Sequence, residues 1–375
     1  MSETKVSHPE TVIKIIGVGG AGGNAVNHMA SSELSAFAFI CANTDAQALA
    51  KTQAETRIQL GESGLGAGSD PAVGRDSATR ERALIAEALK GADMVFITAG
   101  MGGGTGTGAA PVIADVAREL GILTLGVVSK PFDFEGPRRM RVAEEGIATL
   151  ARSVDSLIIV LNSRLEEVLG EDVTQKQAFA AADEVLSKAV TGIAEIISVP
   201  GMVNVDFEDV RTVMRQTGMA MMGSALHAGD DRAVKAAEEA IACPLLDGAN
   251  LRAARGVLVN IAASEETLKL RETKLVMNAI CAQTSDDAII KFGAVFDDTL
   301  GDAMRVTVVA TGLNRPSDFP PGARRASIPR PGAQPQSVLR QNAMHVPVRP
   351  ASGQHEMRSA SVSRQSASTP GEEGQ

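Results

Sequence analysis

Gly100-Met101-Gly102-Gly103-Gly104-Thr105-Gly106-Thr107-Gly108 is the stretch of sequence that decides the fold. An apolar run at 94–99 precedes it and apolar residues at helical spacing follow it over 109–120, which predicts a strand, a glycine loop and a helix. Ordering so many glycines costs backbone entropy, so something is expected to approach the main chain closely. The loop N–H groups, the positive end of the helix and two threonine hydroxyls would together hold phosphate. A flexible linker is the alternative, but polar residues would flank a linker.

A second glycine cluster lies at 17–23, directly after an apolar run at 12–16. Gly17, Gly19 and Gly22 match the dinucleotide fingerprint of a Rossmann fold, which keeps a dinucleotide-dependent oxidoreductase as an alternative. The acidic residue that would bind the ribose should follow about 20 positions on, and Asp45 comes late for that role. The chain has no Gly-x-x-x-x-Gly-Lys-Ser/Thr loop. Two lysine-free glycine loops fit one ligand whose long phosphate chain is held from both sides.

Composition and charge narrow the class of protein. The chain has 375 residues, 44% of them hydrophobic, and its apolar runs are too short for a membrane-spanning helix. Three cysteines at distant positions and five scattered histidines predict a cytoplasmic protein with no metal site of its own. Residues 314–375 contain eight arginines and four acids, a net charge of +4. Because the whole chain carries −9, residues 1–313 carry −13. This acidic body, without Trp or Tyr, argues against nucleic acid as a partner.

The pattern along the chain predicts an α/β fold with two domains. Short apolar runs alternate with amphipathic stretches over 12–173, as in a parallel, doubly wound sheet. A long central helix is expected within 174–201, a second, smaller α/β domain over 202–313, a flexible N-terminus over 1–11, and a disordered tail rich in Pro, Ser and Arg over 314–375. The expected strands are 12–16, 37–42, 94–99, 122–128, 156–161, 256–262, 290–296 and 304–310.

The motifs together resemble the tubulin/FtsZ superfamily of GTPases and, within it, the bacterial cell-division branch. The run Gly102–Gly108 is similar to the superfamily signature, and the resemblance extends over about residues 12 to 313. Other matching stretches are 13–27, 43–49, 64–68, 92–113, 130–136, 199–207 and 292–295. The resemblance implies a protein that binds and hydrolyses GTP and polymerises head-to-tail into filaments of the mid-cell division ring. It also implies GTP or GDP and Mg²⁺ as ligands, with room for a monovalent cation.

The same resemblance implies which residues hold the nucleotide. Phe179 would stack on guanine and Asp183 would accept hydrogen bonds from it; taken alone, the two would be a core phenylalanine and a solvated aspartate. Glu135 and Arg139 would bind the ribose and phosphate side, although their spacing also fits a surface ion pair. Asp45 lies in a phosphate loop of the family, with local helix capping as its alternative. The complete set is Gly19, Gly20, Ala21, Gly22, Asn24, Asn43, Gly102, Gly103, Gly104, Thr105, Gly106, Thr107, Gly108, Glu135, Arg139, Asn162, Phe179 and Asp183.

Candidate catalytic residues lie elsewhere, at Asn204, Asp206 and Asp209. Taken alone, they form a helix N-terminus whose acids suit the helix dipole. In the resembled family this loop of one subunit approaches the γ-phosphate held by the next subunit and positions the attacking water. Hydrolysis would then depend on assembly, and a non-hydrolysing regulator is the alternative.

The C-terminal stretch 366–375 lacks the short hydrophobic peptide by which family members dock on division proteins at the membrane. Ordinary tethering through such partners is therefore not expected. A specialised copy that co-assembles with, or regulates, a tethered relative is the alternative interpretation.

Overall fold

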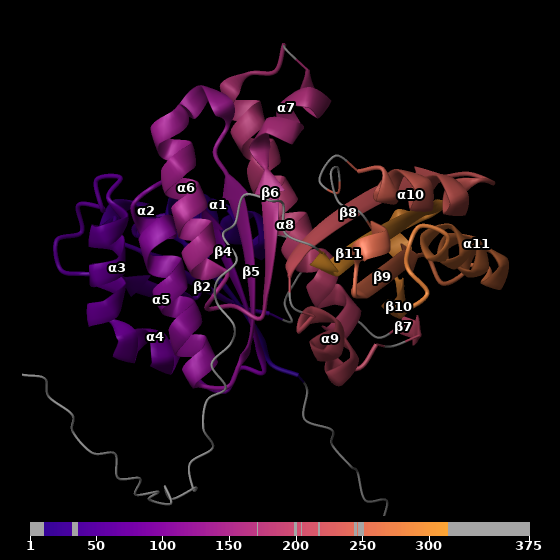
Figure 1. The fold of residues 1–375 in the computed structure, drawn as a ribbon, viewed down its shortest axis with the longest axis horizontal. Coiled ribbons are helices and arrows are strands. Elements are labelled where there is room, and N and C mark those ends of the chain that lie inside the picture. Colours follow the sequence, from indigo (N-terminus) through magenta and orange to yellow (C-terminus); the bar gives the residue numbers. More distant parts are fainter. Residues whose placement is uncertain are drawn as a thin grey trace, which may run out of the picture. The chain divides into compact units, whose positions relative to one another are not determined.

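A computed structural model describes residues 11–31, 37–170, 172–198, 201–203, 205–216, 218–243, 246 and 251–313. In the first half, six parallel strands lie in the order β3-β2-β1-β4-β5-β6 (Figure 1). Their bounds are β1 Ile13–Val18, β2 Ala38–Asn43, β3 Thr56–Gln59, β4 Met94–Gly100, β5 Leu123–Lys130 and β6 Ser156–Leu161. The order reverses between β1 and β4, and ligands of doubly wound sheets bind at such a switch point.

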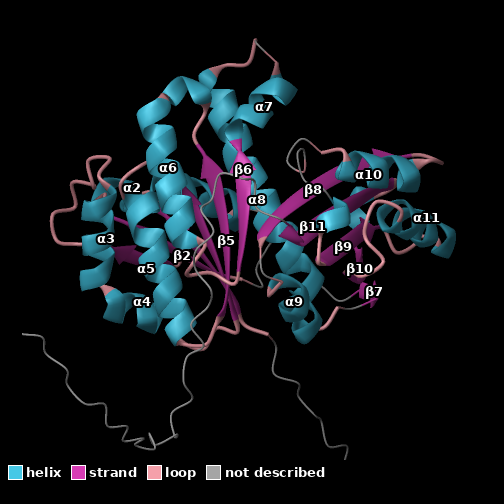
Figure 2. Cartoon of the chain, in the orientation of Figure 1, coloured by secondary structure: helices cyan, strands magenta, loops and turns pink. Residues whose placement is uncertain are grey.

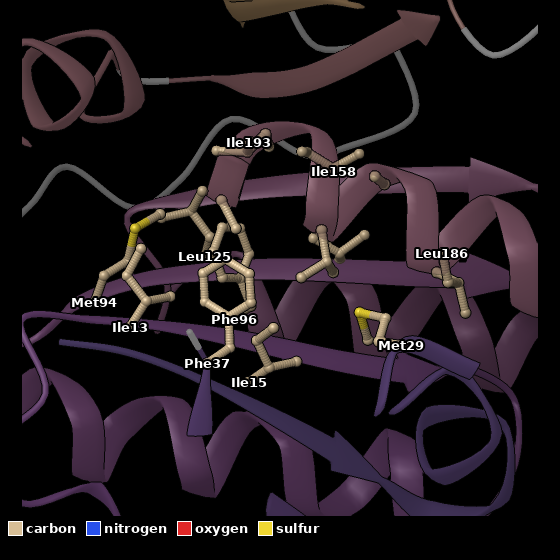
Figure 3. Packing of buried hydrophobic residues seen from close by; sticks show 14 of the residues in the cluster. Ile13, Ile15, Met29, Phe37, Met94, Phe96, Leu125, Ile158, Leu186 and Ile193 are labelled. Carbon is tan, nitrogen blue, oxygen red and sulfur yellow. The ribbon is translucent and has the colours of Figure 1, made fainter. Parts of the chain in front are cut away.

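Helices cover both faces of this parallel sheet (Figure 2). The first face carries α1 (Gly19–Ala30) and the long α8 (Gln175–Ser198), and the second carries α3 (Pro71–Arg80), α4 (Arg82–Leu89), α5 (Thr105–Glu119) and α6 (Pro137–Leu150). Shorter elements are α2 (Ala46–Ala50), the 3₁₀ turn η1 (Asp133–Glu135) and α7 (Asn162–Leu169). Alternate strand residues such as Ile15, Phe96 and Leu125 pack against Met29 of α1 and Leu186 of α8 (Figure 3). The predicted doubly wound α/β architecture is confirmed.

The second half forms a smaller, mixed sheet in the order β8-β11-β9-β10-β7. Only β9 and β10 are parallel to each other, and the remaining pairs are antiparallel. The strands are β7 Gly201–Val203, β8 Met219–Ala228, β9 Gly256–Ala263, β10 Ile289–Phe296 and β11 Ala303–Leu313. The helices are α9 Phe207–Met214, α10 Arg232–Ile241 and α11 Leu270–Cys281, with 3₁₀ turns η2 Leu251–Ala253 and η3 Asp298–Leu300.

The helix α8 joins the two halves. Its residues Leu186, Val190 and Ile193 share one core with the parallel sheet and with Leu258 and Val309 of the second sheet. The sheets themselves meet at a single pair, Ile158 of β6 and Ala220 of β8. The buried side chains of α8 therefore help to join the two sheets.

The glycine stretch differs from the sequence prediction in one respect. The helix expected at 109–120 begins earlier, at Thr105, so half of the glycine stretch is helical and the loop itself is only 101–104. The reason is packing, because Gly106 and Gly108 face backbone atoms of Gly100 and Pro71 that leave no room for a Cβ. None of the helices in the described part of the chain combines the length and the apolar character that crossing a bilayer requires.

Candidate nucleotide site

The two glycine clusters meet at the switch point of the parallel sheet. Val18 of β1 lies opposite Ala99 of β4, so the turns that follow these strands emerge side by side. A Cβ on Gly19 would lie 3.0 Å from the backbone nitrogen of Gly106, and one on Gly100 would lie 2.8 Å from the Cβ of Ala21. The N-termini of α1 and α5 thus converge on one small region, which favours an anion there.

The glycines of this region fall into two groups. At Gly22, Gly102 and Gly104 a Cβ would clash with Thr98, Arg139 and Ala67, so these glycines permit close packing within the protein. At Gly20 and Gly103 a Cβ would meet nothing within 4 Å, and Gly20 is exposed. The second group therefore leaves open space where a phosphate could reach the main chain.

The threonine hydroxyls hold the loop together. Thr107 Oγ1 accepts a hydrogen bond of 2.8 Å from the N–H of Gly102, and it is buried. Thr105 Oγ1 lies 2.6 Å from Oγ1 of Thr44, a residue directly after β2 that the sequence reasoning missed. This contact joins the β2–α2 turn to the glycine loop, and no spacing rule links two residues so far apart in sequence.

The β2–α2 turn is held by local hydrogen bonds. Asn43 is buried, and its Oδ1 accepts from the N–H of Asp45 at 3.2 Å. The Asp45 carboxylate accepts from the N–H groups of Gln47 and Ala48 at 2.8 and 3.1 Å, so it caps α2. The capping interpretation of Asp45 therefore describes its contacts in this structure.

The first turns of α8 lie beside α1. Asn24 of α1 donates a side-chain hydrogen bond to Asp183 of α8, although 159 positions separate them. Burial raises the pKa of Asp183 to about 6, and the Asn24 hydrogen bond only partly opposes this shift. A half-buried carboxylate with a raised pKa is a common feature of binding sites.

Phe179 lies one turn before Asp183 and is 38% exposed, so it is not a core residue. Its ring meets Phe132 edge-to-face, with centroids 5.3 Å apart, and Phe134 at 6.3 Å. Phe132 and Phe134 stack on each other at 5.2 Å. Such packing orients an aromatic ring that keeps one part of its surface free.

The turn η1 brings two further predicted residues close. Glu135 accepts from the N–H of Phe132 at 2.9 Å and pairs with Arg139 at 3.1 Å, so it mainly stabilises the turn. Arg139 is half-exposed and packs behind Gly102. Asn162, the first residue of α7, is buried, and its Oδ1 has no hydrogen-bond partner in the described structure. An orphaned buried acceptor of this kind is what a ligand donor would satisfy.

The predicted catalytic residues lie at the other end of α8. Asp206 caps α9, because its Oδ1 accepts from the N–H of Asp209 at 2.7 Å. The carboxylate of Asp209 pairs with Lys291 of β10 at 2.7 Å. Asn204 lies outside the described residues. About 22 Å of helix separates Asp183 from the end of α8, so these acids do not join the glycine loops of the same subunit.

Two lysine-free glycine turns at a switch point, followed by a long helix and a second sheet, define the class as a tubulin-like nucleotide-binding protein. Residues 12–170 match the model of the Tubulin/FtsZ family GTPase domain, and residues 218–314 match that of the FtsZ family C-terminal domain. The chain belongs to the FtsZ family.

Relatives and solved structures agree with this assignment. The chain is similar to the cell division protein FtsZ of Azotobacter vinelandii, with 57% identity over 312 residues, 82% of this chain and 79% of that protein. The FtsZ of Pseudomonas aeruginosa is also 57% identical, over 80% of this chain and 77% of its own length. An FtsZ dimer from M. jannaschii superposes with a TM-score of 0.77 and 37% identity, covering 84% of this chain and 95% of the other.

Proposed function

We propose that this chain is a GTPase of bacterial cell division that polymerises head-to-tail in the cytoplasm at the mid-cell ring, and that each nucleotide is hydrolysed only when the next subunit is in place. The observation that carries this proposal is the separation of two half-sites. The phosphate cradle, formed by the glycine-rich segments 19–22 and 102–108, and the acidic loop at 205–209 lie toward opposite ends of α8, so one copy would not complete the site. Stacking identical copies head-to-tail would bring unlike ends together and yield an open filament.

The phosphate cradle and the nearby residues of α8 would bind GTP. The open backbone at Gly20 and Gly103 and the N-termini of α1 and α5 would bind the phosphates. The free part of the Phe179 ring would stack on the base, while Asp183 would accept from the N1–H and N2–H₂ groups of guanine, which adenine lacks. Arg139 and Asn162 would contact the phosphate and sugar sides. The other predicted cradle residues would hold these groups in place through the contacts described above.

Mg²⁺ fits this cradle as a ligand of the nucleotide. Within the described residues no group of three His, Cys, Asp or Glu side chains could hold a metal ion, and the glycine turns carry no acid. The ion would therefore be bound mainly by phosphate oxygens and water, as Mg²⁺ prefers, and it would supply charge neutralisation there.

On this proposal, the acidic loop promotes hydrolysis by orienting the attacking water. Asp206 and Asp209 of the incoming subunit, with Asn204, would position a water for attack on the γ-phosphate and accept its proton. Keeping these acids out of the subunit's own cradle avoids repulsion between carboxylates and phosphates while GTP binds. The proposed functional segments are 12–173 for nucleotide binding, 174–201 for the connecting helix and 202–313 for activation.

Mixing two defective variants tests the proposal. Asp209→Ala keeps the cradle but loses the acid, and the double variant Phe179→Ala with Asp183→Ala keeps the acid but loses the base contacts. In a mixed filament some contacts join the intact cradle of the first variant to the intact loop of the second. We expect phosphate release from the mixture to exceed the mean of the separate rates several-fold. A rate equal to that mean would contradict hydrolysis across the contact.

A further inference from the structure

The acidic loop packs against the strand β10. The short β7 pairs with it through Val203 and Ala294, and α9 begins four residues later at Phe207. A Cβ on Gly293 would lie 3.3 Å from Cγ2 of Val205 and 3.5 Å from the carbonyl oxygen of Val203. The absence of a side chain at this glycine lets the loop lie directly on the sheet.

Lys291 lies two residues before Gly293 and therefore on the same face of β10. Its Nζ is 2.7 Å from Oδ1 of Asp209, and both side chains are about one-third exposed. This pair connects the first turn of α9 to the strand beneath it. It leaves Oδ2 of Asp209 without a partner among the contacts of the described residues.

The ion pair between Lys291 and Asp209 also reduces the negative charge of the acidic loop. Asp206, Glu208 and Asp209 place three carboxylates within four residues. Arg211 pairs with Glu208 at 2.7 Å, and Lys291 pairs with Asp209, so two of the three charges are offset within the subunit. Without these cations, a loop that has to approach a triphosphate would meet stronger repulsion.

We infer that Lys291 is a positioning residue for hydrolysis, which fixes the carboxylate of Asp209 and offsets its charge as the loop meets the neighbouring nucleotide. This inference rests on the proposed function. A simple exposed ion pair would stabilise the fold only slightly and leave turnover unchanged. A positioning residue would instead lower kcat with little effect on nucleotide binding or on assembly.

The test compares purified full-length variants in GTP hydrolysis, polymer sedimentation and binding of a fluorescent GTP analogue. We expect Lys291→Met to lower kcat per polymerised subunit about tenfold while KM, GTP affinity and pelleted polymer change less than about twofold. Lys291→Arg should recover most of the rate. Lys235→Met removes the same charge from an exposed position on α10 and should hydrolyse GTP normally.

Three outcomes would overturn the inference: unchanged turnover in Lys291→Met, an equal loss in Lys291→Arg, or a loss of polymer as large as the loss of turnover. Asp209→Asn separates this inference from the proposed function. If Asp209→Asn hydrolyses GTP at the normal rate, the proposed function itself is wrong. If it is slow while Lys291→Met is normal, only the role of Lys291 is wrong.

Discussion

At the scale of single residues, Asp183 shows how a fold prepares a binding group. The side chain lies half-buried between α8 and α1, where removal from water raises its pKa to about 6, while Asn24 holds its orientation. Ionisation of Asp183 is therefore less favourable than that of a free carboxyl until a ligand supplies donors. Guanine offers two N–H donors on one edge, so binding and ionisation of Asp183 should support each other.

This coupling predicts that GTP binding weakens in mild acid. With a pKa of about 6, most Asp183 carboxyls are ionised at pH 7 and about one-tenth at pH 5, so affinity should fall about tenfold over that range. Titrating the subunit with a fluorescent GTP analogue at both pH values measures this. Asp183→Asn should bind GTP more weakly and lose most of the pH dependence.

The neighbouring carboxylate provides a matched control. The hydrogen bond from Lys188 is the main cause that lowers the pKa of Glu184, so this group stays ionised over the same range. Glu184→Gln should leave the pH profile of binding unchanged. If Asp183→Asn retained the normal profile, the assignment of Asp183 to guanine would be contradicted.

At the scale of elements, the starts of α1 and α5 show what a sequence can and cannot predict. Apolar runs alternating with amphipathic stretches predicted the parallel, doubly wound sheet, because this architecture follows from local pattern. The strand β3 was missed because Ile58 is its only buried residue, and β8 was missed because its residues do not alternate regularly. The contacts Asn24–Asp183, Thr44–Thr105 and Asp209–Lys291 join distant segments, so local pattern could not predict them.

The two groups of glycines lead to opposite predictions on α1. Gly22→Ala places a Cβ against the carbonyl oxygen of Thr98 and should lower the free energy of unfolding by about 2 kcal/mol. Gly20→Ala meets no atom and should leave the nucleotide-free fold as stable or slightly more stable. It should nevertheless reduce GTP affinity at least about tenfold, because the new methyl group occupies the space for phosphate.

Urea unfolding without nucleotide and titration with the GTP analogue measure the two effects separately. Normal GTP binding by Gly20→Ala would show that phosphate does not approach α1 there. Unchanged unfolding of Gly22→Ala would show that α1 and β4 can move apart at little cost.

A buried ion pair joins α10 to α11 in the second sheet domain. Arg232 contacts Glu272 at 2.8 Å, and both side chains are less than 10% exposed. Burial alone would raise the pKa of Glu272, but hydrogen bonds from Arg232 and the N–H of Lys269 outweigh it and lower the pKa. The stabilisation is therefore present above the ordinary pKa of 4.5 and is lost as the pH falls below it.

Glu272→Gln should lower the free energy of unfolding by about 3 kcal/mol at pH 7, because Arg232 would remain buried without its counter-charge. Thermal or urea unfolding measures this loss, which should shrink below pH 4.5. The control Glu87→Gln removes the exposed partner of Lys90 and should cost less than about 1 kcal/mol. A similar small loss in Glu272→Gln would contradict the interpretation.

At the scale of the whole molecule, the separation of the half-sites predicts concentration-dependent turnover. Below the concentration at which filaments form, the subunit should bind GTP and hydrolyse it only slowly. Above that concentration, the rate per subunit should rise with the fraction in polymer. Phosphate release and light scattering measured together on dilution test this. A constant rate per subunit without any large particles would contradict the proposal.

The helix α8 has a consequence for the filament as a whole. It is 24 residues long, about 36 Å, and the phosphate cradle and the acidic loop that we propose to meet in the filament lie toward its two ends. A continuous helix packed against both sheets is rigid. The distance between successive nucleotides should therefore be set by the length of this helix within each subunit rather than by the closeness of the contact between neighbouring subunits. Such a filament should keep a nearly constant repeat while nucleotides turn over, and a change of nucleotide state should show first as a change of direction between neighbours.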